Sequence, residues 1–464
     1  MIQLHFRHLG PVQGQALPVK EHGPYKLVTK RDNFTWTEGK SLNKMKSIVY
    51  LCFLIAGIHA DIFCQPNSTY SSPEINNGGN RDQVGPANGH MAGYKVERSI
   101  CQFAFSFYKE VSSQRNNQNV FFSPLSISTA LAMLTLGAKS ETLEQIHRVL
   151  GFKANEIQER EVHEGFRYLT RTLNCQSANF QLDIGNVLFV EEKLKLQLQF
   201  LNDLKDFYKG EAFLENFKNA KQAQKKINEY IENKTRGRII NLLSNVNPDT
   251  EILLVNYIYL KATWNKTFNP KYTKESDFFV DQNTVVKVPM MFRMGTCKQA
   301  YDEQLASTVV QMDYKENGKA YFILPDEGQM KTLESSLSCQ SLSKWRKSIS
   351  ERLTNLYLPR FSISEKLDLK QILFKMGIRN AFTNEADLSG ITGRPRHKIS
   401  EVIHQAKVNV DEKGTEASAA TAIETVPMSM SSTIKFDRPF MMIVAEKNNV
   451  FFMGKIGNPM EISY

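Results

Sequence analysis

The feature that most restricts the fold of this chain is the segment 252–264, with the sequence ILLVNYIYLKATW. It is rich in β-branched and aromatic residues and is apolar at nearly every position. A strand with one face in water alternates apolar and polar residues, so a strand of this kind must be covered on both faces. We therefore predict a central strand in a large sheet, with other elements packed on both sides of it.

Helical and strand signals occupy different parts of the chain. In the segment 142–150 apolar residues recur at helical spacing, and Thr142 and Gln145 have the spacing of a capping box. Further strands are predicted at 320–324, 356–362, 440–444 and 450–456. Most predicted helices lie early in the chain and most predicted strands lie late, which favours an α+β fold over a doubly wound sheet. No linker interrupts the pattern, so we predict a single domain at 98–461.

The N-terminal region has the pattern of a targeting segment preceded by extra sequence. Residues 45–64 begin with a basic start, continue with a short apolar run and end with small residues, which is typical of a signal peptide. We interpret Met45 as the natural start and residues 1–44 as an upstream extension. If translation begins at Met1, the apolar run is internal, and a signal anchor is the alternative. Residues 65–97 are rich in Asn, Gly, Ser and Pro and are predicted to form a flexible leader.

The cysteines and the glycosylation sequons bear on the compartment. The chain has 6 cysteines and no C-x-x-C pair, so zinc and thioredoxin chemistry have no support. The cysteine spacing is too sparse for a disulfide scaffold. Asn67, Asn233 and Asn265 each begin an N-x-Ser/Thr sequon. Together with the signal peptide, these sites predict a secreted, extracellular glycoprotein.

Charge and motifs exclude several classes of function. The net charge is +10, and the first 44 residues contain seven Lys or Arg against three Asp or Glu. The remainder is only mildly basic, which argues against a nucleic-acid partner. The sequence has no H-E-x-x-H, G-x-S-x-G, P-loop or dinucleotide motif, and its 9 histidines do not cluster. We therefore expect no enzyme activity, no cofactor and no metal.

One basic cluster is a candidate binding surface. Lys344, Arg346, Lys347 and Arg352 would share one helix face or its edge. Sulfated glycan is the partner that such a surface favours. An ordinary solvated surface is the alternative interpretation.

The segment 414–430, GTEASAATAIETVPMSM, is small and polar, although its flanks resemble strands. Thr415, Ala417, Ala419 and Thr421 alternate as the residues on one face of a strand do, and none of them is bulky or charged. Such a face could enter a buried sheet without burying a charge. A plain exposed loop is the alternative, but a plain loop has no reason to keep this face free of bulk and charge.

Across residues 98–461 the chain resembles the serpins, most closely the antitrypsin group. The motifs are NVFFSPLSISTALAMLTLG at 119–137, ILLVNYIYLKATW at 252–264, KVPMM at 287–291, ADLSGI at 386–391, EKGTEA at 412–417 and the tail 436–459. The resemblance implies an α+β fold of about nine helices around three β-sheets, with an exposed reactive-centre loop.

The resemblance also implies roles for single residues. Ser123, Ser126, Asn256 and His404 match a buried hydrogen-bonded cluster called the shutter. Trp264 and Arg360 match the breach, where the loop first enters the sheet. Glu412 and Gly414, followed by Thr415, Ala417, Ala419 and Thr421, match the hinge of the loop. We expect an ion pair between Arg360 and Glu412, in which arginine could donate a second hydrogen bond.

Counting seventeen residues from Glu412, as the family does, places the reactive bond at Met428–Ser429. The sequence VPMS at 426–429 resembles the antitrypsin bait, whereas Met430 departs from the usual isoleucine. The implied function is a secreted, monomeric inhibitor that is cleaved by an elastase-like serine protease, forms a covalent complex with it and inserts the loop into the central sheet. No membrane partner is expected.

Two alternatives remain open at this stage. The chain also resembles thyroxine- and corticosteroid-binding globulins, so a non-inhibitory hormone carrier is the second interpretation. A third is an adipokine-like serpin acting on kallikrein-type proteases, which the segment VPMMFR at 288–293 favours. Met428 at the reactive bond argues against a trypsin-like target.

Overall fold

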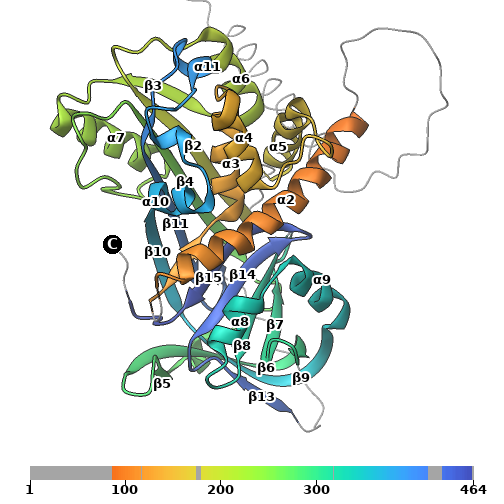
Figure 1. Cartoon of the computed structure of the whole chain (residues 1–464). Helices are drawn as coiled ribbons and strands as arrows, with labels where there is room; N and C mark the ends of the chain where they lie inside the picture. The colour runs from red at the N-terminus through yellow and green to blue at the C-terminus, as the bar shows by residue number, and fades with distance from the viewer. Residues whose placement is uncertain (1–85, 116–117, 174–178, 317, 416–430, 462–464) are drawn as a thin grey trace, which may run out of the picture. The chain divides into compact units, whose positions relative to one another are not determined.

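The computed structural model describes residues 86–115, 118–173, 179–316, 318–415 and 431–461, which all fall in one compact unit. Their strands form two hydrogen-bonded sheets (Figure 1). The smaller sheet has six strands in the order β10-β11-β12-β4-β2-β3. These strands are β2 (Phe180–Glu191), β3 (Glu211–Glu215), β4 (Ile252–Thr263), β10 (Phe361–Asp368), β11 (Ile399–Val410) and β12 (Gly414–Thr415).

The larger sheet has nine strands in the order β1-β15-β14-β8-β7-β6-β9-β13, with β5 paired to β6. They are β1 (Val120–Phe122), β5 (Lys274–Phe279), β6 (Val285–Asp302), β7 (Ser307–Asp313), β8 (Lys319–Pro325), β9 (Ser350–Pro359), β13 (Ser432–Lys435), β14 (Phe440–Glu446) and β15 (Asn449–Ile456). Strand β6 pairs with β5 at one end and with β7 at the other. Two of the three predicted sheets are therefore joined through β6 into one continuous hydrogen-bonded sheet.

Ten α-helices are present in the described part of the chain. They are α2 (Pro86–Ser112), α3 (Pro124–Thr135), α4 (Ser140–Leu150), α5 (Glu159–Leu173), α6 (Leu198–Tyr208), α7 (Ala220–Lys234), α8 (Met330–Ser336), α9 (Cys339–Ser348), α10 (Leu369–Met376) and α11 (Ser389–Thr392), with 3-10 turns η1 (Pro270–Tyr272) and η2 (Asn380–Phe382). Most helices precede most strands, so the predicted α+β class is confirmed. None of the helices seen in this part is long and apolar enough to cross a membrane.

Strand β4 is covered on both faces, as its sequence predicts. All of its residues except Lys261 are buried. Leu254 and Ile258 face the main core beside α3, whereas Leu253 and Val255 pack in a second cluster with α7. This double cover explains why the strand is apolar at nearly every position.

Two local predictions are corrected by the structure. Helix α2 begins at Pro86, so residues 86–97 are helical and are not part of a flexible leader. Its Ala92 and Val96 recur at helical spacing and are buried where Gly165 of α5 approaches closely. The predicted capping box is also absent, because α4 already begins at Ser140 and follows a residue without a side-chain cap.

The side chains of Thr142 and Gln145 instead form hydrogen bonds to the backbone of the loop before α11. Gln145 Oε1 accepts hydrogen bonds from the backbone N–H groups of Arg379 and Asn380, at 2.7 and 2.9 Å. Thr142 Oγ1 accepts one from the N–H of Asp387 at 3.0 Å. Both residues therefore fix a distant loop to α4, which a local pattern does not reveal.

The described residues contain a disulfide, although the cysteine spacing did not predict a disulfide scaffold. Cys101 of α2 is bonded to Cys339 of α9 across 238 residues, with a Cα–Cα distance of 5.9 Å. Closing a loop of that length restricts the unfolded chain and stabilises the fold by about 5 kcal/mol in the chain-entropy account. Cys297 is free and buried, and burial raises the pKa of its thiol.

Candidate functional site

The central feature of the site is a short strand wedged between two longer ones. β4 and β11 are paired in parallel from Ile252 and Ile399 to Tyr259 and Lys407. Beyond that point β12 lies between them, and Thr415 pairs with Val410 of β11 and with Ala262 of β4. A longer strand could continue along β12 only if β4 separated from β11.

Close packing holds β12 in this wedge. Gly414 is required there, because a Cβ atom on it would lie 2.0 Å from the carbonyl oxygen of Ala262. Thr415 is fully buried, and its hydroxyl lies 3.0 Å from the hydroxyl of Tyr314. The Tyr314 ring stacks on Trp264 with centroids 4.5 Å apart. The indole N–H of Trp264 donates to the carbonyl oxygen of Asp411 at 3.1 Å, so the base of the loop is fixed from both sides.

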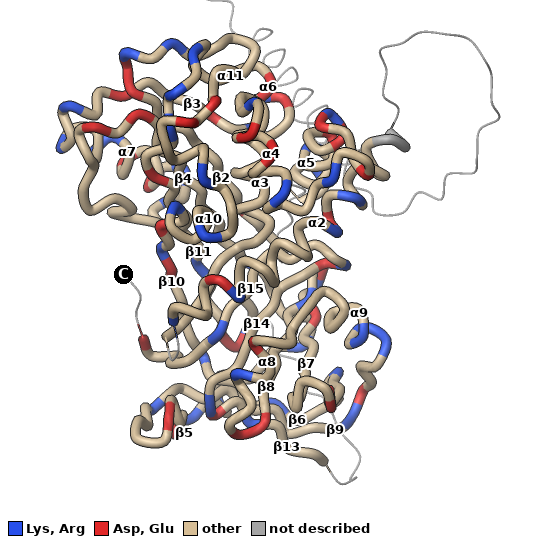
Figure 2. Tube along the Cα trace, viewed as in Figure 1, with Lys and Arg blue, Asp and Glu red and all other residues tan. Residues whose placement is uncertain are grey.

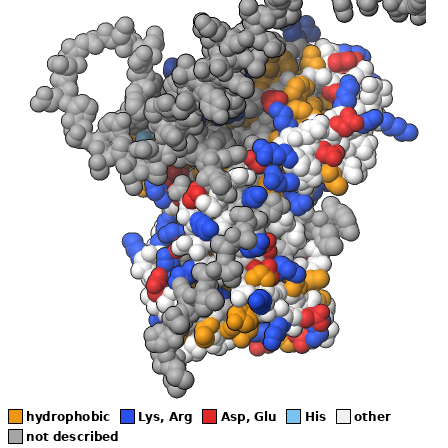
Figure 3. All heavy atoms as spheres, turned by 180° about the vertical axis from the view of Figure 1, so that it is seen from behind, with side chains coloured by type: hydrophobic (Ala, Val, Ile, Leu, Met, Phe, Trp, Pro, Cys, Tyr) orange, Lys and Arg blue, Asp and Glu red, His pale blue; other side chains and the backbone are white. Residues whose placement is uncertain are grey.

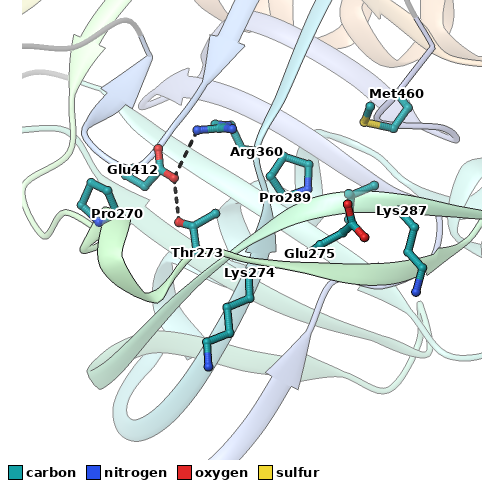
Figure 4. Close-up of a pocket in the computed structure, with 10 residues that line it drawn as sticks. Pro270, Thr273, Lys274, Glu275, Lys287, Pro289, Arg360, Glu412 and Met460 are labelled. Carbon is teal, nitrogen blue, oxygen red and sulfur yellow. Dashed lines mark hydrogen bonds and ion pairs between the residues drawn. The ribbon is translucent and has the colours of Figure 1, made fainter.

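Glu412 lies at the entry to the wedge, where its carboxylate is almost fully buried (Figure 4). Arg360 Nη1 lies 3.6 Å from Glu412 Oε1, so the predicted ion pair is present. The arginine is half exposed, and at 3.6 Å it donates no hydrogen bond to the carboxylate. Thr273 of the turn after η1 supplies that bond, and its hydroxyl donates to the same oxygen at 2.7 Å. The sequence analysis did not find Thr273, because it lies 139 residues from Glu412.

We expect Glu412→Lys to lower the thermal unfolding midpoint much more than Arg360→Ala. The lysine would place a second cation beside Arg360 in a buried position, at a cost of about 2–4 kcal/mol. Removing the half-exposed arginine leaves Thr273 in place and should cost about 0–1 kcal/mol. Differential scanning calorimetry of both variants measures the difference. Equal losses would mean that the carboxylate has no special role at this entry.

The predicted shutter residues are all in contact and form one buried network. Ser123 caps α3, with its hydroxyl accepting from the N–H of Ser126 at 3.1 Å. The amide nitrogen of Asn256 on β4 donates to the Ser126 hydroxyl at 2.6 Å and to Asn186 Oδ1 on β2 at 2.6 Å. His404 of β11 closes the network, and the His404 side chain is fully buried.

The network fixes the protonation state of His404. Its Nε2 accepts a hydrogen bond from the backbone N–H of Ser123 at 3.1 Å, so the proton must be on Nδ1, which donates to Asn256 Oδ1. Burial lowers the pKa of His404 to about 3. This histidine thus joins β11, β4 and the start of α3 at the seam that must open if a strand is to enter.

We expect the stability of this seam to fall in mild acid. Below the unfolded-state pKa of about 6.5, the unfolded chain binds a proton that folded His404 excludes, so the free energy of unfolding falls as the pH decreases toward 3. At pH 5 this contribution is about 2 kcal/mol smaller than at pH 7.5. The urea midpoint measured across this range for the wild type and for His404→Gln tests it. A His404→Gln protein with an unchanged pH slope would contradict the assignment.

A cavity of about 360 Å³ adjoins the Glu412 carboxylate. It is lined by Lys274, Glu275, Lys287, Arg360 and Glu412, together with the less polar residues Pro270, Thr273, Val288, Pro289 and Met460 (Figure 4). A second cavity of about 80 Å³ is also polar and lies beside Lys266, Arg293 and Lys298. Neither has the apolar lining that a hydrophobic ligand requires. No group of three His, Cys, Asp or Glu side chains that could bind a metal occurs in the described ranges.

The basic cluster is only partly available for a ligand. Lys344 Nζ donates to Asp302 at 2.7 Å, and Arg346 donates to Asn448 at 2.8 Å. Lys347 and Arg352 are exposed. Figure 2 marks Lys and Arg positions in blue along the trace of α9, and positions of both charge signs are otherwise mixed over the molecule.

The remaining predicted residues divide into two groups. Asn233, in the last turn of α7, and Asn265, after β4, are both exposed. The reactive-bond residues, the distal hinge residues and the first sequon lie outside the described residues; these are Met428, Ser429, Ala417, Ala419, Thr421 and Asn67.

Comparison with known proteins identifies the family. Residues 98–459 match the family model described as serpin (serine protease inhibitor). An alpha-1-antitrypsin-like protein of Ictidomys tridecemlineatus is 43% identical over 372 residues, covering 80% of this chain and 90% of that protein. Alpha-1-antiproteinase of Bos taurus is 44% identical over 370 residues, covering 79% and 89%.

The solved structures agree with the sequence relatives. Human thyroxine-binding globulin in complex with thyroxine has a TM-score of 0.77 and 39% identity, covering 80% of this chain and 100% of that chain. This chain belongs to the serpin family and has its α+β fold. It is an antitrypsin-like protease inhibitor and not an enzyme.

Proposed function

We propose that this serpin inhibits elastase-type serine proteases as a suicide substrate cleaved at Met428–Ser429. The observation that supports this most is the position of β12. It already occupies the first positions of a new strand between β4 and β11. The chain that follows it, residues 416–428, contains small residues at alternate positions and ends at the proposed bond.

The proposed sequence of events follows from this arrangement. The serine hydroxyl of the protease attacks the Met428 carbonyl, Ser429 leaves as the new amino terminus, and an acyl-enzyme forms. The freed segment then extends β12 between β4 and β11 and carries the protease with it. The shutter network and the Trp264–Tyr314 stack oppose this opening before cleavage. The uncleaved form is accordingly held by a kinetic barrier.

The bait residue favours an elastase-like target. Met428 is unbranched and apolar, which suits a shallow apolar pocket, whereas a pocket with a buried acid would select Lys or Arg. Oxidation of Met428 to its sulfoxide makes the side chain polar and is expected to weaken inhibition. We propose that the inhibitor acts as a monomer in a one-to-one covalent complex.

The likeness to thyroxine-binding globulin makes a hormone carrier the second candidate. Both cavities described above have charged linings, which disfavour an apolar hormone. The hinge sequence favours inhibition, because no charged residue and no proline lies between Ala417 and Ile423 to hinder insertion into the sheet. Binding of radiolabelled thyroxine or cortisol with no effect on any protease would favour the carrier.

We further propose secretion and glycosylation. The segment 45–64 has the pattern of a signal peptide, and the Cys101–Cys339 disulfide is typical of an oxidising compartment. Asn265 and Asn233 are exposed acceptors. Digestion of the protein from cultured cell medium with a glycosidase that removes N-linked chains tests both points.

A sulfated glycan is proposed to bind at the exposed Lys347 and Arg352. Because Lys344 and Arg346 are engaged by Asp302 and Asn448, we expect weak, salt-sensitive binding. Replacing Lys347 and Arg352 together by alanine should lower the salt concentration that elutes the protein from a heparin column. An unchanged elution would contradict the assignment of the glycan site to these two residues.

Titration of neutrophil elastase against increasing inhibitor tests the main proposal. We expect a linear loss of activity to zero near one inhibitor per enzyme, which is irreversible on dilution. Recovery of full activity on dilution, or no loss at all, would contradict the suicide mechanism.

A further inference from the structure

The second cavity, of about 80 Å³, is lined in part by Asn265, the acceptor of a glycosylation sequon. The rest of the lining comes from four neighbouring segments: Lys266 after β4, then Arg293, Thr296 and Lys298 of β6, Gln311, Met312 and Asp313 of β7, and Glu351 of β9. The cavity is larger than the about 15 Å³ that one water molecule needs and smaller than the about 300 Å³ of a site that encloses a whole ligand. It therefore suits one part of a molecule that is held at its rim.

The lining offers hydrogen-bond donors and acceptors together. Asp313 accepts from Lys298 Nζ at 2.6 Å and from Gln311 Nε2 at 2.7 Å. Glu351 is exposed, and its carboxylate accepts no hydrogen bond from the part of the chain that the structure describes. An anion would meet these carboxylates, and an apolar group would leave the polar atoms unpaired. A neutral sugar fits better, because each of its hydroxyl groups can both donate and accept.

The wider surface has the same mixed character. Figure 3 shows one face of the molecule, on which Lys and Arg side chains lie among Asp and Glu, while hydrophobic side chains gather toward the lower end. Such a mixture does not favour a polyanion over a neutral polar ligand.

Asn265 fixes the place where a sugar would lie. Its side chain is exposed, and its backbone N–H donates to the carbonyl oxygen of Asp313 at 2.8 Å. A glycan linked to Asn265 Nδ2 therefore begins at the rim of the cavity. A short covalent tether gives an effective concentration of about a millimolar or more. A contact too weak to capture a free sugar is then occupied by the attached one.

We propose that the second cavity seats the first N-acetylglucosamine of the glycan on Asn265. The inference rests on the proposed glycosylation and gives that glycan a role in the uncleaved inhibitor. The hydroxyl and acetamido groups of the sugar bond to polar groups of the lining, with Lys298 as a donor and Glu351 as an acceptor. The seated sugar thereby ties the end of β4 to β6, β7 and β9.

The seat adjoins the contact that closes the entry for the loop. Trp264 directly precedes Asn265 and forms an isolated bridge with Tyr314, which directly follows Asp313. This bridge connects the ends of β4 and β7, which belong to different sheets. Tyr314 also contacts the hydroxyl of Thr415 in β12. A seated sugar adds a second link between the two sheets at this point and opposes their separation before cleavage.

The first experiment follows the release of N-linked chains from the protein secreted by cultured mammalian cells. Asn233 is also an exposed acceptor and serves as the internal control. In the folded protein we expect a glycosidase to release the chain on Asn265 about tenfold more slowly than the chain on Asn233, because a seated sugar is protected. After denaturation the two rates should be equal. Mass spectrometry of the separated peptides measures both rates.

Two variants test whether the cavity causes this protection. Glu351→Ala and Lys298→Ala each remove one polar group of the lining, and each should speed release at Asn265 by at least about threefold without changing release at Asn233. Glu327→Ala is the matched control, because Glu327 is an exposed glutamate in the turn after β8, outside the cavity. Equal release from both sites of the folded wild type, protection that neither variant changes, or an Asn265 that carries no sugar would overturn the seat.

Loss of the sequon tests the link between the sheets. We expect Asn265→Gln to shorten the half-life of inhibitory activity at about 50 °C by about threefold, and Asn233→Gln to match the wild type. Equal half-lives in all three proteins would overturn the link. Release of the sugars does not depend on inhibition. A protein with a protected chain on Asn265 that forms no complex with elastase would therefore refute the proposed function and leave the seat standing.

Discussion

Replacing Met428 by arginine is expected to slow the inhibition of elastase by about a thousandfold and to create fast inhibition of trypsin. An arginine in a shallow apolar pocket leaves a charge without a partner, at a cost of about 4 kcal/mol in the acylation step. In trypsin the same side chain meets the buried acid of the specificity pocket. Second-order rate constants of inhibition for both proteases measure this change of selectivity.

The chain offers a matched control for this prediction two residues further on. Met430 is also followed by serine, so Met430→Arg makes the same substitution beside the same small residue. If the reactive bond is Met428–Ser429, this variant should keep most of its activity against elastase and gain little against trypsin. A change of selectivity in Met430→Arg, with none in Met428→Arg, would move the reactive bond to Met430–Ser431.

Replacing Ala419 by glutamate is expected to convert the inhibitor into a substrate. Extending the register of β12 places Ala419 opposite Ala406 of β11 and Ile258 of β4, both fully buried. Insertion would then bury an unpaired carboxylate, at a cost of several kcal/mol. Deacylation would overtake insertion, so a denaturing gel should show cleaved protein, little complex and a stoichiometry raised at least about tenfold.

Ser418→Glu is the matched control for loop insertion. The same register places Ser418 opposite Lys407, which is half-buried and could pair with the new carboxylate. This variant should retain complex formation. Loss of complex in both variants, or in neither, would contradict the assignment of Ala419 and Ser418 to opposite faces of the inserted strand. Thr415→Arg is less informative, because Thr415 is already buried against Tyr314 and the change would disturb the uncleaved fold as well.

Much of the fold follows from the sequence because burial leaves a strong local pattern. The apolar segment 252–264 predicts a strand covered on both faces, and β4 is such a strand. The shutter residues could be assigned only through the family resemblance. Ser126, Asn256 and His404 come from three distant segments, and nothing in their local sequence indicates that they meet.

What the sequence did not predict depends on contacts between distant segments. The Cys101–Cys339 disulfide joins helices 238 residues apart. Thr273 reaches Glu412 only because the turn after η1 packs beside β12.

The most direct test of the account is a denaturing gel of the protein after incubation with neutrophil elastase, with sequencing of the released peptide. We predict a band at the combined mass of inhibitor and protease that resists boiling in detergent, and a small peptide whose first residue is Ser429. Cleavage without such a band, or a released peptide that begins at another residue, would contradict the inhibitory mechanism or the reactive bond assigned here.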